Sequence, residues 1–104
     1  MKRILIILVM ILSYHITNAQ NKITGKITDN ITGEAIPGTT VYIPELKTGT
    51  IADLNGVYKI ENLPKVKVII QVSFLGYKSA VENIDLATTT SRDFILEQAI
   101  TEMN

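Results

Sequence analysis

The sequence predicts an all-β protein, a seven-stranded antiparallel β-sandwich. Two observations support this fold class: apolar and polar residues alternate in short segments, and turn residues interrupt the chain roughly every eight to twelve positions. A third is the scarcity of helical periodicity, since beyond residue 20 only Phe94–Met103 has a pattern that an amphipathic helix would accept. Together they indicate two packed sheets made of short strands.

Residues 1–19 are expected to form a secretory signal peptide that is cleaved after Ala19. Lys2 and Arg3 precede the apolar run Ile4–Leu12, which is shorter than the roughly 20 residues a membrane-spanning helix needs. Small residues, Thr17 and Ala19, then stand where a signal peptidase cuts. An uncleaved anchor or a buried first strand is the alternative. The domain is expected to be 20–97, followed by a C-terminal tail or linker, 98–104.

The composition beyond Ala19 argues against catalysis and against nucleic-acid binding. His15 is the only histidine, there is no cysteine, and the formal charge falls from zero to about −2 once Lys2 and Arg3 are removed. Such a chain lacks the usual nucleophile and base pairs, an ordinary zinc or copper site, and a basic surface for phosphates. We expect no enzyme, cofactor or metal. The carboxylates weighed as acid and base all lie at predicted turns or strand ends: Glu34, Asp53, Glu61 and Asp85.

The first strands are predicted on either side of two turns. Ile23–Thr28 alternates with a period of two and ends near Asp29, where Asn30–Gly33 supplies turn residues. After a second break at Ile36–Gly38 comes Thr40–Ile43, which Pro44 ends because proline cannot donate to a ladder.

A hairpin is predicted next, with Thr48–Ala52 paired to Val57–Ile60 across the cluster Asp53–Gly56. Asn55 and Gly56 suit the positive φ of a tight hairpin turn. The same cluster resembles the opening of a calcium loop. Val57 and Lys59 stand where further oxygen ligands would be needed, so a turn is favoured over a metal site.

The longest strand is predicted at Lys65–Phe74, after a break at Pro64, and should be central in its sheet. One face would place five apolar side chains in the core: Val66, Val68, Ile70, Val72 and Phe74. Gly76 then turns the chain into Tyr77–Ile84, and Arg92–Glu97 is the last strand. The residues expected to serve as structural turns are Gly33, Pro37, Gly38, Asp53, Asn55, Gly56, Pro64 and Gly76.

Three segments resemble the carboxypeptidase regulatory-like domain, in the version found at the N-terminus of SusC/RagA-type TonB-dependent outer-membrane receptors. They are "GKITDNITGEAIPGTTVYI" from Gly25, "GTIADLNGVYKIENLP" from Gly49 and "SFLGYKS" from Ser73. The resemblance covers Ile23 to Glu97 and implies a transthyretin-like or starch-binding-domain-like sandwich in the periplasm. In those receptors the domain precedes a TonB-contacting segment, a plug and an outer-membrane barrel.

The sequence departs from that family in two places. The receptors usually continue after the domain into a valine-rich acidic segment, whereas this sequence ends with Gln98–Asn104. The chain is therefore expected to be either the front piece of a longer receptor or a free-standing periplasmic module. Ala52 stands where threonine is common before the turn aspartate.

The resemblance implies a non-catalytic accessory module that acts in the periplasm by contact with envelope proteins, either the rest of a receptor or TonB. The alternative is a stand-alone sandwich that binds a carbohydrate or another ligand, and a passive spacer is a third. Sugar binding would need exposed aromatic faces. Tyr42, Tyr58 and Tyr77 are instead expected to be half-buried with hydroxyls in water, and there is no tryptophan.

Overall fold

The computed structural model describes residues 21–99, and within them the fold is all-β, as predicted. Seven strands are joined by turns and one short 3₁₀ helix. Their bounds are β1 (Asn21–Asp29), β2 (Thr40–Ile43), η2 (Pro44–Leu46), β3 (Thr48–Ile51), β4 (Val57–Leu63), β5 (Lys67–Ser73), β6 (Ala80–Asp85) and β7 (Phe94–Leu96). The predicted signal peptide, residues 1–19, lies outside the described residues.

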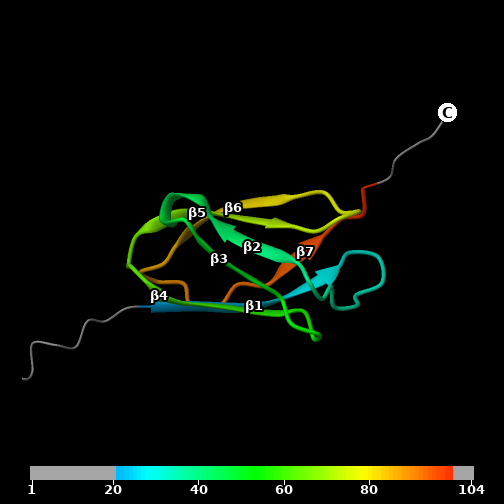
Figure 1. Cartoon of the computed structure of the whole chain (residues 1–104), viewed down its shortest axis with the longest axis horizontal. Helices are drawn as coiled ribbons and strands as arrows, with labels where there is room; N and C mark the ends of the chain where they lie inside the picture. The colour runs from blue at the N-terminus through cyan, green and yellow to red at the C-terminus, as the bar shows by residue number, and fades with distance from the viewer. Residues whose placement is uncertain (1–20, 100–104) are drawn as a thin grey trace, which may run out of the picture.

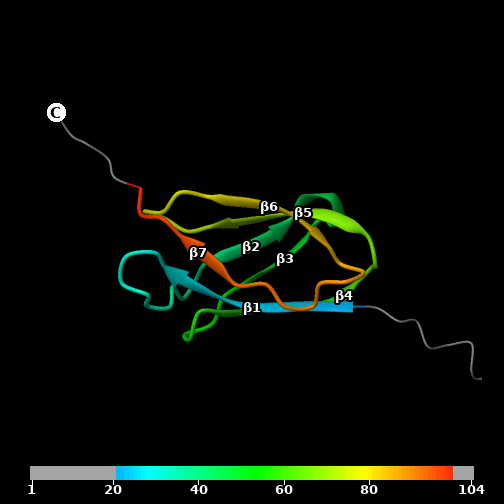
Figure 2. The ribbon, with the colours of Figure 1, turned by 180° about the vertical axis from the view of Figure 1, so that it is seen from behind.

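The strands form two sheets packed face to face, with strand orders β4-β1-β7 and β3-β2-β5-β6. Figures 1 and 2 show β1 and β4 in one layer, and β2, β3, β5 and β6 in the other. The inward side chains alternate along each strand and form one apolar core. Its fully buried members include Ile23, Ile27, Ile43, Tyr58, Leu63, Ile70, Leu86 and Leu96. In the described part of the chain no helix is long and apolar enough to cross a membrane.

The central position predicted for the longest strand is confirmed, because β5 pairs with β2 on one side and β6 on the other. Val68, Ile70 and Val72 of this strand are buried. The expectation that Val66 and Phe74 also enter the core was wrong. The strand spans only Lys67–Ser73, so these two residues lie beyond its ends and are exposed.

The predicted hairpin between β3 and β4 is wrong as well. The turn at Asp53–Gly56 exists, but β3 belongs to the four-stranded sheet and β4 to the three-stranded sheet. β3 pairs with β2, from Thr40↔Ile51 to Ile43↔Thr48, and β4 pairs with β1. The turn therefore carries the chain from one layer of the sandwich to the other.

The pairing of β1 with β7 is the exception to the antiparallel arrangement. The two strands run parallel, with Ile27 opposite Phe94 and Asp29 opposite Leu96. Every other pair of neighbouring strands is antiparallel. β1 lies between β4 and β7 in its sheet. The first and last strands of the described chain are therefore direct neighbours.

Gly25 leaves a gap in β1 that the ring of Tyr58 fills. Gly25 lies opposite Tyr58 in the β1–β4 ladder, and an added Cβ would meet the Tyr58 ring at 2.9 Å. The buried ring is 5.9 Å from the ring of Phe94 on β7 and its hydroxyl donates to the Arg92 carbonyl. A single side chain of β4 thus reaches across the central strand to the segment that leads into β7.

Candidate functional site at the Asp29 end of the sandwich

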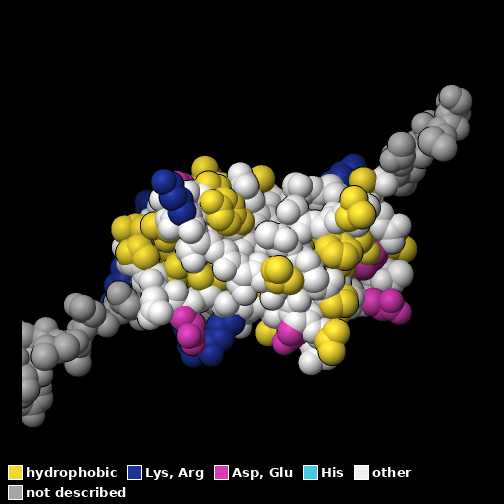
Figure 3. Space-filling view, in the orientation of Figure 1, with side chains coloured by type: hydrophobic (Ala, Val, Ile, Leu, Met, Phe, Trp, Pro, Cys, Tyr) yellow, Lys and Arg dark blue, Asp and Glu magenta, His cyan; other side chains and the backbone are white. Residues whose placement is uncertain are grey.

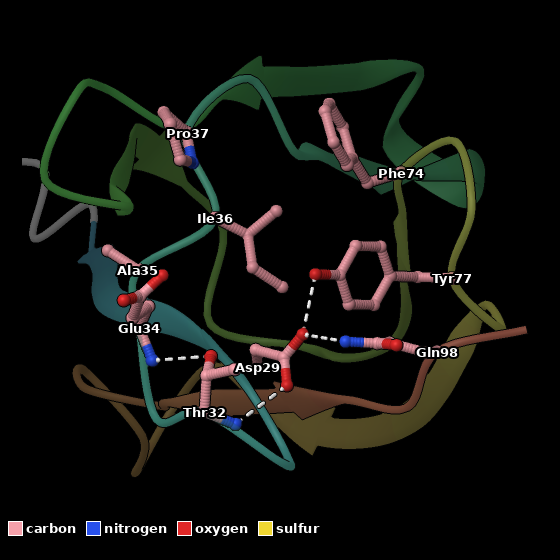
Figure 4. Close-up of a pocket in the computed structure, with 9 residues that line it drawn as sticks. All are labelled: Asp29, Thr32, Glu34, Ala35, Ile36, Pro37, Phe74, Tyr77 and Gln98. Carbon is pink, nitrogen blue, oxygen red and sulfur yellow. Dashed lines mark hydrogen bonds between the residues drawn. The ribbon is translucent and has the colours of Figure 1, made fainter.

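Asp29, the last residue of β1, carries a carboxylate and is only 4% exposed. It lies at the end of the sandwich where the connection after β1, the turn after β5 and the chain after β7 meet (Figure 4). Buried carboxylates are uncommon and need polar partners. This one is the best candidate for a functional centre in the fold.

Both oxygens of Asp29 accept hydrogen bonds. Oδ1 accepts from the backbone N–H groups of Ile31 at 2.7 Å and Thr32 at 3.0 Å. Oδ2 accepts from the Tyr77 hydroxyl at 2.6 Å and from Nε2 of Gln98 at 2.8 Å. We call Asp29, its two side-chain partners and its two backbone partners the Asp29 clasp.

The local sequence explains how the clasp forms. Asp29 begins a turn in which its own carbonyl accepts from the Gly33 N–H at 2.9 Å, and its N–H donates to the Glu34 carbonyl at 2.8 Å. Aspartate at the start of a turn commonly accepts from backbone N–H groups two and three residues later. Gly33 has φ of 71°, in the left-handed region that glycine adopts without strain.

The four hydrogen-bond donors around Asp29 favour the ionised form of its carboxylate. The hydrogen bonds from Gln98, Tyr77 and Thr32 hold the pKa of Asp29 well below its usual range. In turn, the hydrogen bond to Asp29 raises the pKa of Tyr77. A carboxylate with four donors and a depressed pKa is a poor general base, because a base must take up a proton near neutral pH. The arrangement is suited to holding chain segments together.

An open pocket of about 370 Å³ adjoins the clasp. Ile36, Pro37 and Phe74 line its apolar part, and Glu34 contributes a carboxylate to its rim. Among residues 21–99, no group of three or more acidic, histidine or cysteine side chains is placed to hold a metal ion. The pocket offers contact area and the negative charge of Glu34 beside the last described residues of the chain.

Asp29→Asn is expected to lower stability at neutral pH and to make stability less dependent on pH. Because the folded-state pKa lies below the unfolded one, the ionised clasp stabilises the fold fully above the unfolded value of about 3.9. That contribution is lost progressively as the pH falls from about 5 toward the folded-state pKa. Urea unfolding of wild type and variant at pH 7, 5, 4 and 3 should show the difference in stability shrinking below pH 5.

Glu34→Gln is the matched control for this experiment. It removes a carboxylate from the same pocket without touching any hydrogen bond of the clasp. We expect its stability relative to wild type to change far less between pH 7 and pH 3. A difference between wild type and Asp29→Asn that stays constant over this range would contradict the ionised clasp.

The predicted turn residues lie in the connections between strands. Four glycines have positive φ: Gly33 at 71°, Gly38 at 83°, Gly56 at 74° and Gly76 at 89°. Pro37 and the flanking residues of Gly33 line the pocket, and Gly76 accepts a hydrogen bond from the chain after β7. Pro64 follows β4, and its carbonyl accepts from the Val66 N–H.

The residues Asp53–Gly56 form the turn that connects β3 in one sheet to β4 in the other. Oδ1 of Asp53 accepts from the N–H groups of Asn55 at 2.9 Å and Val57 at 3.0 Å. The predicted positive φ is present at Gly56 and not at Asn55. The non-glycine residues of the described chain that do have positive φ are Lys47 and Asn62, which the sequence did not single out.

The tyrosines do not form an aromatic binding face. The expectation of hydroxyls reaching water was wrong for two of them, because Tyr58 donates to the Arg92 carbonyl and Tyr77 donates to Asp29. Tyr42, 39% exposed, lies alone on the outer face of β2. The other exposed aromatic ring among residues 21–99 is Phe74, 38% exposed, which lines the pocket beside Tyr77. The rings of Phe74 and Tyr77 are tilted by 44° and do not form one flat stacking surface, which counts against the carbohydrate alternative.

The start of the segment expected to be a tail is part of the fold. Gln98 pairs with Tyr77 in an isolated bridge and donates to Asp29. The Ala99 N–H donates to the Gly76 carbonyl at 2.8 Å. The chain is therefore fixed at this end as far as Ala99, two residues beyond the predicted domain boundary at residue 97.

Sequence reasoning missed Asp29 and Gln98 as a pair. A signal for Asp29 was present, since an aspartate ended a strand directly before the turn residues Asn30–Gly33. No sequence signal pointed to Gln98, whose position depends on the parallel pairing of β7 with β1.

Exposed aliphatic side chains occupy three of the connections. Ile31, Leu54 and Leu75 are 72%, 89% and 93% exposed. They lie in the turns after β1, β3 and β5, which are at the same end of the sandwich in Figure 1. Figure 3 shows hydrophobic side chains in several separate groups on the face it presents. Single exposed aliphatic residues are ordinary on protein surfaces, so the distinguishing feature of these three is that they lie at the same end of the sandwich.

The fold and the clasp define a class of protein: a small β-sandwich with glycines of positive φ in its turns, in which the last described residues are bonded to the end of β1. Residues 23–104 match the family described as the CarboxypepD_reg-like domain, and the chain belongs to this family. It is also similar to TonB-dependent receptor P3 of Formosa agariphila, with 23% identity over 97 residues. That match covers 93% of this chain and 9% of the receptor, so the chain spans about a tenth of that relative's length.

Solved structures with the same fold come from a cohesin–dockerin assembly. A chain of the type II cohesin–X-dockerin complex of Acetivibrio cellulolyticus, in an N-terminal interface mutant, gives a TM-score of 0.66 at 13% identity. That match covers 75% of this chain and 58% of the other. The C-terminal interface mutant gives 0.53 at 15% identity, covering 72% and 52%. At these identities the likeness shows the β-sandwich fold alone.

Proposed function

We propose that the chain is a non-catalytic accessory module of a TonB-dependent outer-membrane receptor, and that it acts by protein contact on the periplasmic side. The observation that carries the proposal is the match to TonB-dependent receptor P3, which spans 93% of this chain. Membership of the regulatory-like domain family is consistent with a role that is not catalytic.

The geometry of the Asp29 end supports a contact role. A carboxylate occupied by four donors stabilises the turn after β1, the turn after β5 and the chain after β7 in one arrangement. The tips of these turns present Ile31 and Leu75 to solvent. A partner that meets this end would find exposed aliphatic side chains next to the last described residues of the chain.

Fractionation of the source cells tests the receptor assignment. An antibody raised against Gln20–Asn104 is used to probe cytoplasmic, periplasmic, inner-membrane and outer-membrane fractions. The proposal predicts a large product in the outer-membrane fraction. A soluble periplasmic band of about 9 kDa, the size left after removal of a signal peptide, would contradict it. Antibodies against known proteins of each compartment serve as controls.

Single cysteines test which surface makes the contact, because residues 1–104 contain none. Leu75→Cys lies on a turn tip at the Asp29 end, and Val81→Cys, also at an exposed aliphatic, lies on the outer face of β6. Each variant is labelled in cells with a thiol-attached photo-crosslinker. We expect a discrete crosslinked product from Leu75→Cys and none from Val81→Cys. Equal crosslinking at both positions would contradict a contact surface at this end.

A further inference from the structure

The pocket beside the Asp29 clasp contains an exposed aromatic ring in a defined position. Phe74 directly follows β5 and is 38% exposed, although its side chain is large and apolar. A Cβ at Gly38 would lie 3.3 Å from the Phe74 ring, so the ring lies against the backbone of that turn. The Tyr77 ring is 6.1 Å away, between centroids, and its hydroxyl is held by Asp29. The Phe74 ring is therefore supported by fixed neighbours while part of it stays open to solvent (Figure 4).

The same pocket carries negative charge that no described cation compensates. Asp29 and Glu34 line it, and none of the described residues that line it is basic. The four donors to Asp29 are backbone N–H groups, a hydroxyl and an amide, which are all neutral and do not cancel its charge. Neither carboxylate takes part in an ion pair within residues 21–99, where the pairs are Lys59–Glu61, Lys78–Glu97 and Arg92–Glu82.

The charge of Glu34 acts inside the pocket as well as at its rim. The hydrogen bond to Asp29 is the main cause of the raised pKa of Tyr77, and the charge of Glu34 contributes to the same rise. Solvent and salt screen the interaction between charges that are far apart at a surface. The carboxylate of Glu34 is therefore close enough to make the region around the Tyr77 hydroxyl more negative.

An aromatic ring beside uncompensated negative charge is suited to an organic cation. A guanidinium or ammonium group is attracted to the face of a ring within about 6 Å of its centre, and arginine is found there more often than lysine. Both side chains also have apolar stems, which pack on apolar surface while the charged group reaches polar atoms. Ile36 and Pro37 supply apolar surface in this pocket. A long basic side chain would match both its apolar part and its charge.

The surroundings of the pocket favour a protein segment over a small cation on its own. The pocket is open, and its volume of about 370 Å³ is near the lower end of the range of small-molecule sites. Ile31 and Leu75, 72% and 93% exposed, lie in the turns after β1 and β5, which also contribute to the pocket. Protein interfaces commonly combine an arginine anchor with apolar contacts around it. A segment with a basic residue between apolar neighbours would find both kinds of contact here.

We propose that this pocket binds a basic side chain of a partner protein, arginine in preference to lysine, with the stem against Phe74 and the charged group facing Glu34 and Asp29. The inference adds the chemistry of the partner to the proposed contact function and rests on that function.

A titration of the purified chain, Gln20–Asn104, followed by NMR tests the proposal. The probe is a short peptide, blocked at both ends, with one arginine between two leucines. Its control has citrulline in place of arginine, which keeps the shape and removes the charge. We expect shifts of the backbone amides of Glu34, Phe74 and Tyr77, and about tenfold weaker binding of the citrulline peptide. Equal binding of the two peptides, shifts confined to other surfaces, or no shifts at millimolar peptide would overturn the proposal.

Two variants with a matched control test the residues. Phe74→Ala is expected to weaken binding of the arginine peptide several-fold, whereas Tyr42→Ala should leave it unchanged. Tyr42 is 39% exposed, close to the 38% of Phe74, but lies on the outer face of β2 and does not line the pocket. Glu34→Gln, which keeps every hydrogen bond of the clasp, should weaken the arginine peptide and not the citrulline peptide. An unchanged affinity in either Phe74→Ala or Glu34→Gln would overturn the proposal.

Acetyl-arginine amide distinguishes a protein segment from a small cation. It has the guanidinium group without neighbouring residues, and it should bind more weakly than the peptide. Binding as tight as that of the peptide would overturn a protein segment as the occupant. The peptide titration and the fractionation of cells fail separately, because absence of peptide binding would leave the receptor assignment standing. A soluble periplasmic band would likewise leave the measured peptide affinity standing.

Discussion

Gly25→Ala is expected to destabilise the domain by about 3 kcal/mol, close to the upper end of what overpacking a core costs. A Cβ at this position would lie 1.8 Å from the carbonyl oxygen of Arg92 and 2.9 Å from the ring of Tyr58. The carbonyl belongs to backbone that is itself bonded to β1, and it also accepts from Tyr58. Neither neighbour can move without breaking a contact, and urea unfolding at equilibrium measures the cost.

Gly33→Ala is the control, because it separates steric conflict from backbone preference. Gly33 has φ of 71° and open space where a Cβ would stand. Alanine there should cost only the left-handed conformation, about 1 kcal/mol. If both alanine variants lost the same small amount, the close approach at Gly25 would not be a constraint on the fold.

Tyr58→Ala is expected to cost about 3 to 5 kcal/mol, the range for removing a large aromatic side chain from a core. Tyr58 is the largest of the fully buried side chains and bridges the gap at Gly25 toward Phe94. In a small domain this loss is a large part of the total stability. Thermal unfolding followed by circular dichroism should show a much lower midpoint, or a chain that is unfolded at room temperature.

Tyr58→Phe isolates the hydroxyl from the ring. Burial, together with the charge of Asp93, raises the pKa of Tyr58, so the hydroxyl remains a donor to the Arg92 carbonyl. Phenylalanine would keep the packing and leave that carbonyl without this donor, at a cost of about 1 to 2 kcal/mol. A phenylalanine variant as unstable as the alanine variant would mean that the hydrogen bond, and not the ring, dominates.

Local patterns in the sequence were sufficient to predict most of the strands. The alternation in Lys65–Phe74 predicted the central strand β5 and the inward side chains Val68 and Ile70. Pro44 ended β2 as expected and begins η2. Each of these features depends on side-chain period or backbone freedom within a few residues, which a single sequence displays directly.

Features that depend on distant pairing were not predicted. The turn at Asp53–Gly56 has the residues of a hairpin turn, but whether β3 and β4 share a sheet is decided by β2 and β1, their partners elsewhere in the chain. The direction of β7 likewise depends on β1. The Asp29 clasp follows from that pairing, because Gln98 reaches Asp29 only when β7 lies beside β1 in parallel.

Neighbouring first and last strands also constrain the order in which the domain can fold. Lys26 and Asp93 are 67 residues apart in the chain, and Asp29 and Gln98 are 69 apart. Pairing over such separations closes a long loop and is slow relative to local pairs such as β5 with β6. A chain that emerges N-terminus first can pair β5 with β6 early, while β1 waits for its partner β7. The three-stranded sheet is completed only when the last described residues have emerged. A chain stopped short of Phe94 should therefore leave one edge of β1 without its partner strand.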